Sequence, residues 1–368
     1  MFQNIKKLIS SADRMLFVLP VILSLFGIVM IASATKSYDG GLKFIIVQSG
    51  AFLIGLFLML IMLSFDYERF KEKPALWFML SIALLIFVLI FGKEESGTKG
   101  WIRFAGIGIQ PSEFVKIGFA ITFARHLESS GDSISRPLPF AGLLLHAGIL
   151  IGLVLMQPDY GTAMVYIFMF LCTIFAAGIK YRILLTFAGA FAVFAPLAWF
   201  FILKPFQQDR ILSFLSPESD PAGAGYQVMQ SKVAIGSGEL AGNGLFSGTQ
   251  TQLGLLPAKH TDFIFGVIGE ELGFIGCLAV IAVLFSIVIK CYIVGMNART
   301  DYGKYLCIGI GSMLLFQIFE NIGMCIGVMP VTGIPLPFLS YGGSSMVTSM
   351  VALGLVLSVS ARQKMINF

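Results

Sequence analysis

The stretch Leu256-Pro-Ala-Lys-His-Thr-Asp-Phe-Ile-Phe265 closes the only long part of the chain that is not hydrophobic. This polar part, residues 204–265, lies between apolar segments that are long enough to cross a membrane. Long connections are uncommon in compact proteins, and those that persist are often functional. The sequence therefore places the functional residues in or beside this stretch.

The rest of the chain has the composition of a membrane protein. Of its 368 residues, 57% are hydrophobic and 12% are charged, about half the charged share of a soluble domain. We predict an all-α polytopic membrane protein with about ten transmembrane helices. Residues 1–368 form one integral membrane domain, with a large loop at 204–263 between the seventh and eighth helices.

Ten apolar segments approach the roughly twenty residues that a spanning helix needs. They cover residues 15–34, 42–64, 75–92, 112–127, 140–157, 159–178, 183–203, 264–289, 303–328 and 338–361. The first resembles a signal peptide, since basic residues precede it and Ala32-Ser33-Ala34 ends it. Because its apolar run is longer than a usual signal core, we expect an uncleaved helix.

The basic residues predict the orientation. Ten crossings put both termini on one side, and the connectors on that side hold fifteen of the 25 Lys and Arg residues. Short loops rich in Lys and Arg stay in the cytoplasm, so both termini are expected there and the large loop on the outer face. The net charge of +5 follows this topology and does not indicate nucleic-acid binding.

Two connectors break the helical pattern. Residues 101–113 are rich in Gly and moderately apolar, which predicts an interfacial or re-entrant piece before the fourth helix. In Gln157-Pro-Asp-Tyr-Gly-Thr162, Asp159 stands in the first turn of the sixth helix. Within the large loop, residues 226–235 predict a short amphipathic helix, and the glycines from 236 to 248 predict a flexible stretch.

Charged groups at membrane depth are costly and usually functional. Glu113 and Lys116 are spaced i,i+3 and can pair along one helix face, either as a structural ion pair or as part of a recess for a lipid headgroup. Glu320 is a lone acid in an apolar run and leaves the same two readings open. His146, one of only three histidines, fits a hydrogen-bonded core residue better than a metal ligand.

Asp262 lies where the large loop re-enters the membrane. It suits a helix N-cap, because aspartate accepts hydrogen bonds from the first free N–H groups of a helix. It equally suits a catalytic carboxylate at the membrane surface. The residues alone leave both readings open.

The motifs of the chain resemble those of the SEDS family (RodA, FtsW and SpoVE). The longest match is Asn321-Ile-Gly-Met-Cys-Ile-Gly-Val-Met-Pro-Val-Thr-Gly-Ile-Pro-Leu-Pro-Phe-Leu-Ser-Tyr-Gly-Gly-Ser-Ser345. Shorter matches occur in order at 101–116, 157–162, 225–238 and 260–273, so the resemblance covers nearly the whole chain. The run that ends at Phe338 is more similar to RodA, the elongation branch, than to FtsW. Ala258, Lys259 and Glu320 depart from the residues expected in the family.

The resemblance implies a peptidoglycan glycosyltransferase that polymerises lipid II at the outer face of a bacterial cytoplasmic membrane, for cell elongation and shape. It implies an essential acid at Asp262. The implied partners are undecaprenyl-diphosphate-linked glycan, membrane lipids and a class B penicillin-binding protein, which is a monofunctional transpeptidase.

We expect Asp262 to act as general base on the acceptor 4-hydroxyl, with inversion and with undecaprenyl diphosphate as leaving group. Cations near the diphosphate would assist, with a divalent metal (Mg or Mn) as a further candidate and no organic cofactor. The expected substrate-binding residues are Arg210, Lys232, Lys259, His260, Thr261, Trp101, Arg103, Glu113, Lys116, Asp159, Ser340 and Gly342.

Two other functions remain open. A lipid II flippase would use buried charges at mid-depth such as Glu113 and Glu320, and it would tolerate Asp262→Asn. A scaffold that only recruits a transpeptidase would also tolerate that change, and it would fail on surface changes that block partner binding.

Overall fold

The computed structural model describes residues 12–95, 98–104, 107–201 and 223–363, together with residues 208, 212, 214, 216 and 220. In this part of the chain, each of the ten predicted segments forms a helix. These are α2 (Arg14–Thr35), α3 (Gly41–Ser64), α4 (Pro74–Phe91), α5 (Pro111–Ser130), α6 (Pro137–Leu155), α7 (Tyr160–Ala176), α8 (Tyr181–Phe201), α12 (Ile264–Met296), α13 (Asp301–Ile326) and α14 (Gly343–Gln363).

Seven of these described helices are long and apolar enough to cross a membrane: α2, α3, α4, α6, α12, α13 and α14. A further helix, α7, is apolar but shorter, and α5 carries several charged residues. The central helix α14 is almost wholly buried, whereas α2, α3 and α4 expose apolar side chains such as Leu53, Phe57 and Met79. Such an apolar exterior belongs in lipid, so the chain is a polytopic helical membrane protein.

Both ends of the described chain lie at one end of the bundle, as predicted. The Asp13 backbone N–H donates to Ser360 Oγ (3.1 Å), and Lys290 Nζ lies 3.0 Å from Asp13 Oδ2. Arg299 Nη2 donates to the Gln363 carbonyl at 3.3 Å. The start of α2, the end of α14 and the α12–α13 connection therefore meet there, and the large loop joins α12 at the opposite end.

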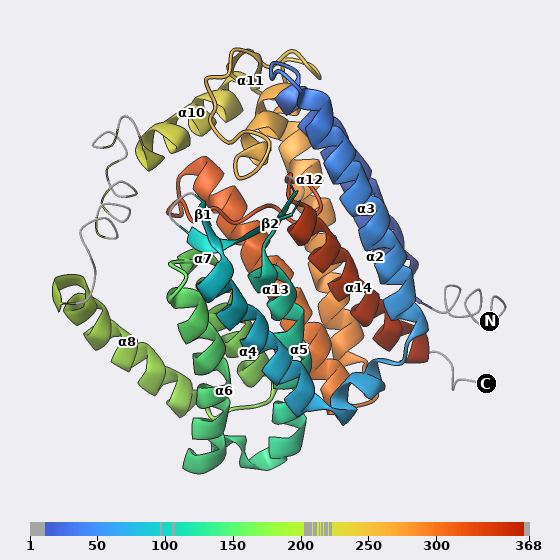
Figure 1. Cartoon of the computed structure of the whole chain (residues 1–368), viewed down its shortest axis with the longest axis vertical. Coiled ribbons are helices and arrows are strands. Elements are labelled where there is room, and N and C mark those ends of the chain that lie inside the picture. The colour runs from blue at the N-terminus through green and yellow to red at the C-terminus, as the bar shows by residue number, and fades with distance from the viewer. Residues whose placement is uncertain are drawn as a thin grey trace.

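At that opposite end lie α10 (Ala224–Ser237) and α11 (Thr249–Gln252), seen above the bundle in Figure 1. The short helix predicted at 226–235 is thus confirmed as part of α10. A small antiparallel sheet also forms there, in the order β1 (Lys93–Glu95), β2 (Thr98–Phe104) and β3 (Ile107–Ile109). The Gly-rich piece before α5, expected as an interfacial or re-entrant segment, is therefore largely a hairpin. Two short 3-10 helices, η1 (Tyr67–Glu72) and η2 (Gly131–Ser135), complete the fold.

The glycine-rich stretch after α10 is predicted to be flexible. In the structure it packs against a break in α12 and forms backbone hydrogen bonds with it. Gly273 has a φ of 65°, which interrupts the helix. Asn243 N–H donates to the Glu270 carbonyl (3.0 Å), and Phe274 N–H donates to the Glu239 carbonyl (2.9 Å). The stretch thus satisfies backbone groups that the break leaves free. Gly242, with a φ of 80°, approaches the Glu271 carbonyl so closely that no Cβ fits.

We expect Gly242→Ala to destabilise the protein more than Gly254→Ala. Both glycines have a positive φ, but only Gly242 meets backbone atoms where a Cβ would stand. Gly254→Ala should cost about 1–2 kcal/mol for its left-handed backbone, and Gly242→Ala about 1–3 kcal/mol more for the collision. Thermal unfolding of the purified protein in detergent measures both, and equal losses would contradict the close approach.

Candidate functional site

Asp262 lies in the turn that leads into α12. The helix begins at Ile264, its N-cap residue is Phe263, and no side chain caps it. The N-cap reading of Asp262 is therefore wrong. Asp262 is half-buried as a residue, and its carboxylate receives no hydrogen bond or ion pair from the described residues.

The Asp262 backbone, in contrast, is held by hydrogen bonds. Asn321 Nδ2 on α13 donates to the Asp262 carbonyl (2.8 Å) and also to the Ile334 carbonyl (2.8 Å). Cys325 Sγ lies 3.6 Å from the same Asp262 oxygen. Two residues earlier, the His260 carbonyl accepts from Tyr341 N–H at 2.8 Å. The segment before α12 is thus fixed against the connection between α13 and α14.

The surroundings of Asp262 alter its acidity. Burial raises the pKa of its carboxyl to about 6, because protein atoms replace the water that would stabilise the charged form. A carboxyl with this pKa is ionised at neutral pH and is a stronger base than an ordinary aspartate. Such a group suits proton abstraction from a hydroxyl.

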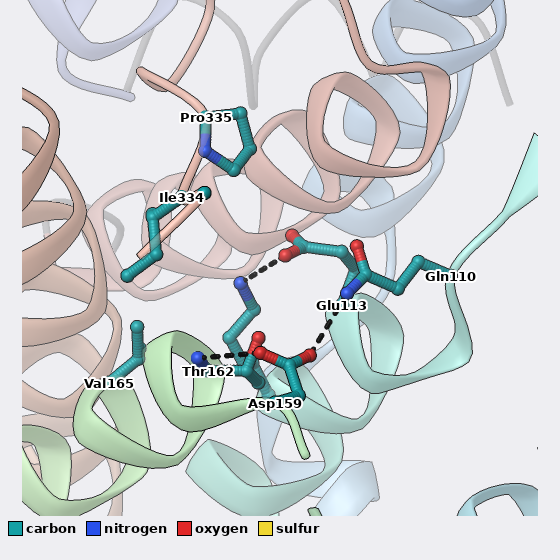
Figure 2. A pocket seen from close by; sticks show the side chains of 9 residues that line it. Gln110, Glu113, Asp159, Thr162, Val165, Ile334 and Pro335 are labelled. Carbon is teal, nitrogen blue, oxygen red and sulfur yellow. Dashed lines mark hydrogen bonds and ion pairs between the residues drawn. The ribbon is translucent and has the colours of Figure 1, made fainter. Parts of the chain in front are cut away.

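Asp262 borders a pocket at the N-terminal ends of α5 and α7. A methyl group placed on Gly333 would stand 3.7 Å from Asp262 Oδ2. Gly333 itself lines the pocket, next in the chain to Ile334, which Figure 2 labels. As a cavity the pocket is small, about 20 Å³ for a water-sized probe, and it is partly open to solvent. Its other lining residues are Gln110, Glu113, Lys116, Asp159, Thr162, Val165, Ile334 and Pro335.

The floor of this pocket is an ion pair. Lys116 Nζ lies 2.6 Å from Glu113 Oε1, and the two side chains are 1% and 4% exposed. The pairing predicted from their spacing is confirmed. Glu113 Oε2 is buried and has no partner among the described residues, so the pocket retains one unsatisfied acceptor.

Asp159 and Gln110 form the adjoining wall. Asp159 Oδ1 accepts from Thr162 N–H (3.0 Å), which caps α7, and Asp159 Oδ2 accepts from Gln110 Nε2 (3.0 Å). Figure 2 shows the two acids, Glu113 and Asp159, on neighbouring helices around the pocket. Both acids already have partners, so their carboxylates serve to shape the pocket.

Comparisons with known proteins place this arrangement in a family. Residues 13–365 match the family model of FtsW, RodA and SpoVE, described as cell cycle proteins. The chain belongs to the FtsW/RodA/SpoVE family. That is the SEDS family whose motifs the sequence resembles.

Curated relatives from both branches match at similar identity. The peptidoglycan glycosyltransferase MrdB of Escherichia coli (strain K12) is 36% identical over 322 residues, which cover 86% of each chain. A probable peptidoglycan glycosyltransferase FtsW of Idiomarina loihiensis is 37% identical, covering 96% of this chain and 88% of its own. Identity alone therefore does not separate the two branches.

Solved structures share the fold. A chain from a peptidoglycan synthase complex, solved to describe the coordination of polymerization and crosslinking, superposes with a TM-score of 0.83 at 30% identity. It aligns over 96% of this chain and 99% of its own. The rod shape determining protein RodA of Thermus thermophilus gives 0.72 at 26% identity, over 96% of this chain and 98% of its own.

The basic residues expected near the diphosphate differ in their exposure to solvent. Lys232 on α10 is exposed and extends over Gly327, at the end of α13. Arg103 on β2 is also exposed. Arg210 lies outside the described residues. Only Lys232 and Arg103 can therefore be assigned an exposed position.

Lys259 is fully buried and takes part in the folding of the loop. Its ammonium donates to Ser37 Oγ (2.9 Å) and to the Thr251 carbonyl, and it lies 4.7 Å from the centre of the Tyr38 ring. Thr251 is held in turn by Glu270, whose Oε2 accepts from Thr251 Oγ1 at 2.6 Å. Because its donors are occupied, Lys259 anchors α11 in this structure and is not directed at the pocket.

His260 and Thr261 fix the local conformation. The His260 ring packs among those of Tyr38, Phe44 and Tyr341, with centroid distances of 5.7, 4.8 and 5.6 Å. Burial lowers the pKa of His260 to about 4, so the ring is neutral at neutral pH. Thr261 Oγ1 donates to the Ala258 carbonyl at 3.2 Å. Neither side chain provides a cation for a phosphate.

The other three expected residues, Ser340, Gly342 and Trp101, lie in a turn and in a hairpin. Gln48 Nε2 donates to the Ser340 carbonyl (3.0 Å), and its Oε1 accepts from Gly342 N–H (3.1 Å). Ser340 and Gly342 thus belong to a turn that a helix side chain holds. The Trp101 ring covers Gly108 within the β2–β3 hairpin.

Sequence reasoning gave no role to several residues of the site. Asn321 and Gly333 were noted only as parts of a long signature, and Gln48 was not noted. The available signal is an amide side chain inside an apolar segment, at Gln48 and again at Asn321, although Gln317 gives the same signal in the segment of Asn321. Buried amides of this kind usually satisfy backbone groups.

We expect Lys116→Met to destabilise the protein by about 3–5 kcal/mol, because it leaves the Glu113 carboxylate buried and uncompensated. The double variant Glu113→Leu/Lys116→Met should recover most of this loss. Lys71→Met is the control, since Lys71 pairs with Glu68 and Glu128 at a more exposed position and should cost about 1 kcal/mol or less. Unfolding in detergent provides the comparison. No recovery in the double variant would contradict the buried pair.

Proposed function

We propose that this protein is a peptidoglycan glycosyltransferase that polymerises lipid II, with Asp262 as the general base. The glycosyltransferase class follows from family membership and from relatives of both branches across nearly the whole chain. One observation carries the catalytic assignment: the Asp262 carboxylate has a pKa raised to about 6 and accepts no hydrogen bond from the described residues.

The chemistry needs only one carboxylate. The donor is a glycan chain on undecaprenyl diphosphate, and diphosphate departs without a proton. The paired acid and base of glycoside hydrolases are therefore unnecessary. Asp262 takes the proton of the acceptor 4-hydroxyl as that oxygen attacks the anomeric carbon. The new glycosidic bond forms as the bond to diphosphate breaks, with inversion.

The diphosphate carries the negative charge that must be stabilised. Lys232, Arg103 and Arg210 are the proposed cations, since guanidinium groups bind phosphate in a forked geometry. Within the described residues, no group of three His, Cys, Asp or Glu side chains is placed to hold a metal ion. We therefore propose that a divalent cation, if used, is held by the diphosphate itself. No step above depends on it.

The pocket of Glu113, Lys116 and Asp159 is proposed to receive one polar group from the headgroup of a lipid substrate, because its cavity of about 20 Å³ has room for little more than a water-sized group. Its floor combines a buried cation with an unsatisfied carboxylate oxygen, which suits a sugar with both donors and acceptors. Its wall at Gly333 adjoins Asp262, so a headgroup there would lie within reach of the base.

The proposed enzyme spans a bacterial membrane and works with a transpeptidase partner. The bias of Lys and Arg toward one set of connectors supports a bacterial cytoplasmic membrane protein with both termini in the cytoplasm and Asp262 on the outer face. The partner is a class B penicillin-binding protein; the synthase complex that this chain resembles couples polymerization to crosslinking. The Ile334-Pro-Leu-Pro-Phe338 run favours the elongation branch.

Asp262→Asn is expected to abolish polymer formation, by about 100-fold or more, because asparagine cannot take the proton. Glycan synthesis from purified lipid II measures this, with and without the transpeptidase. Glu239→Gln serves as the control, since this exposed loop acid lies outside the pocket.

Polymer from a folded Asp262→Asn variant at the wild-type rate would exclude Asp262 as the base. No polymer from wild type under any of these conditions would favour a flippase or a scaffold.

A further inference from the structure

Asn321 joins the segment that carries Asp262 to the wall of the pocket. It is fully buried in α13, and its amide nitrogen donates to the carbonyls of Asp262 and Ile334 at 2.8 Å each. An amide NH2 group has two hydrogens, so both are used. One side chain therefore spans two segments that are far apart in the sequence.

These two contacts control the position of the catalytic carboxylate. Asp262 bears that carboxylate, whereas Ile334 and its neighbour Gly333 line the pocket. The other side chain near the Asp262 carbonyl is the Cys325 thiol at 3.6 Å, and a thiol is a weak donor. Loss of the Asn321 amide would leave the buried Ile334 carbonyl without this donor and the Asp262 carbonyl with only the weak Cys325 thiol, and it would free the Asp262 segment from the pocket wall.

We propose that Asn321 is a positioning residue for polymerisation, which holds the Asp262 carboxylate beside Gly333 in its water-poor site. This inference rests on the proposed role of Asp262 as base. Misplacement of a reacting group by about 1 Å can reduce the rate about 100-fold. Asn321 thus sets the turnover number, and substrate binding depends on the residues of the pocket.

The inference also predicts the pH profile. Asp262 must be ionised to act, so wild-type activity should fall as the pH drops through about 6. Freed from its site, the carboxylate would gain water and its pKa would decrease toward the ordinary 3.8. The acid limb would then move to lower pH.

Other titratable groups face this region. They are Glu320 and Cys325 on α13, Tyr341 after it, His260 and Lys259 on the same segment, Lys232 on α10, and Glu113, Lys116 and Asp159 across the pocket. None of these residues is changed by a substitution at Asn321.

The test compares Asn321→Leu with Gln317→Leu in the purified full chain with lipid II. Both substitutions remove a buried amide from α13, but the Gln317 amide has no partner among the described residues. Asn321→Leu should lower kcat about 100-fold, keep KM within about threefold, and move the acid limb below pH 6. Gln317→Leu should leave the limb in place. Asn321→Gln retains the NH2 group and should restore part of kcat.

Each outcome decides the proposal. If Asn321→Leu loses no more kcat than Gln317→Leu, or if its acid limb does not move, the positioning role is excluded. Should Asn321→Leu fail to fold, Asn321→Gln decides, with kcat about tenfold lower and a shifted limb expected. Asp262→Asn, assayed in parallel, separates the two proposals: full activity there removes the base assignment itself, independently of Asn321.

Discussion

A carboxylate in a helix bundle that faces lipid needs a donor or a cation from the protein, because little water is available there. Five acids in the half of the bundle that holds the large loop meet that requirement. Their partners are Lys116 for Glu113, Gln110 and Thr162 for Asp159, Thr251 for Glu270, Ser33 for Glu271, and Thr332 for Glu320. The Asp262 carboxylate has no such partner within the described chain, and burial raises its pKa with no hydrogen bond to lower it again.

The surrounding structure keeps Asp262 in this unfavourable environment. The break in α12 is closed by the loop after α10, and Lys259 fastens α11 to the α2–α3 turn. Asn321 and the Tyr341 N–H then fix the last residues before α12. These hydrogen bonds hold the segment that bears Asp262, so its carboxylate keeps a fixed position. Such preorganisation supports catalysis.

Hydrophobicity alone was sufficient to predict the ten helices, because each spanning segment must satisfy its own backbone inside lipid. Their bounds agree to within three residues at most ends, but α12 extends seven residues further than predicted, to Met296, and α14 begins five residues later, at Gly343. The Glu113–Lys116 pair was also predictable, since i,i+3 spacing places both on one helix face. Asp262 was chosen through the family resemblance, and its two local readings were separated only by the observed start of α12.

Contacts between distant segments could not be predicted from the sequence. A lysine side chain can bind phosphate, but the Lys259 ammonium already donates to Ser37 and Thr251. The glycines near Gly242 suggested flexibility, whereas they permit close approach to α12. The Asn321 amide hydrogen-bonds to backbone carbonyls in two separate connections between helices. No local sequence pattern predicts which residues it will reach.

The most direct measurement is a titration of the Asp262 carboxyl in the substrate-free protein. Infrared difference spectra of wild type, with those of Asp262→Asn subtracted, isolate its C=O band as the pH changes. The account predicts a midpoint near pH 6, because burial destabilises the ionised form. A midpoint near 4, typical of a hydrated aspartate, would contradict the claim that the fold desolvates this residue to make it a base.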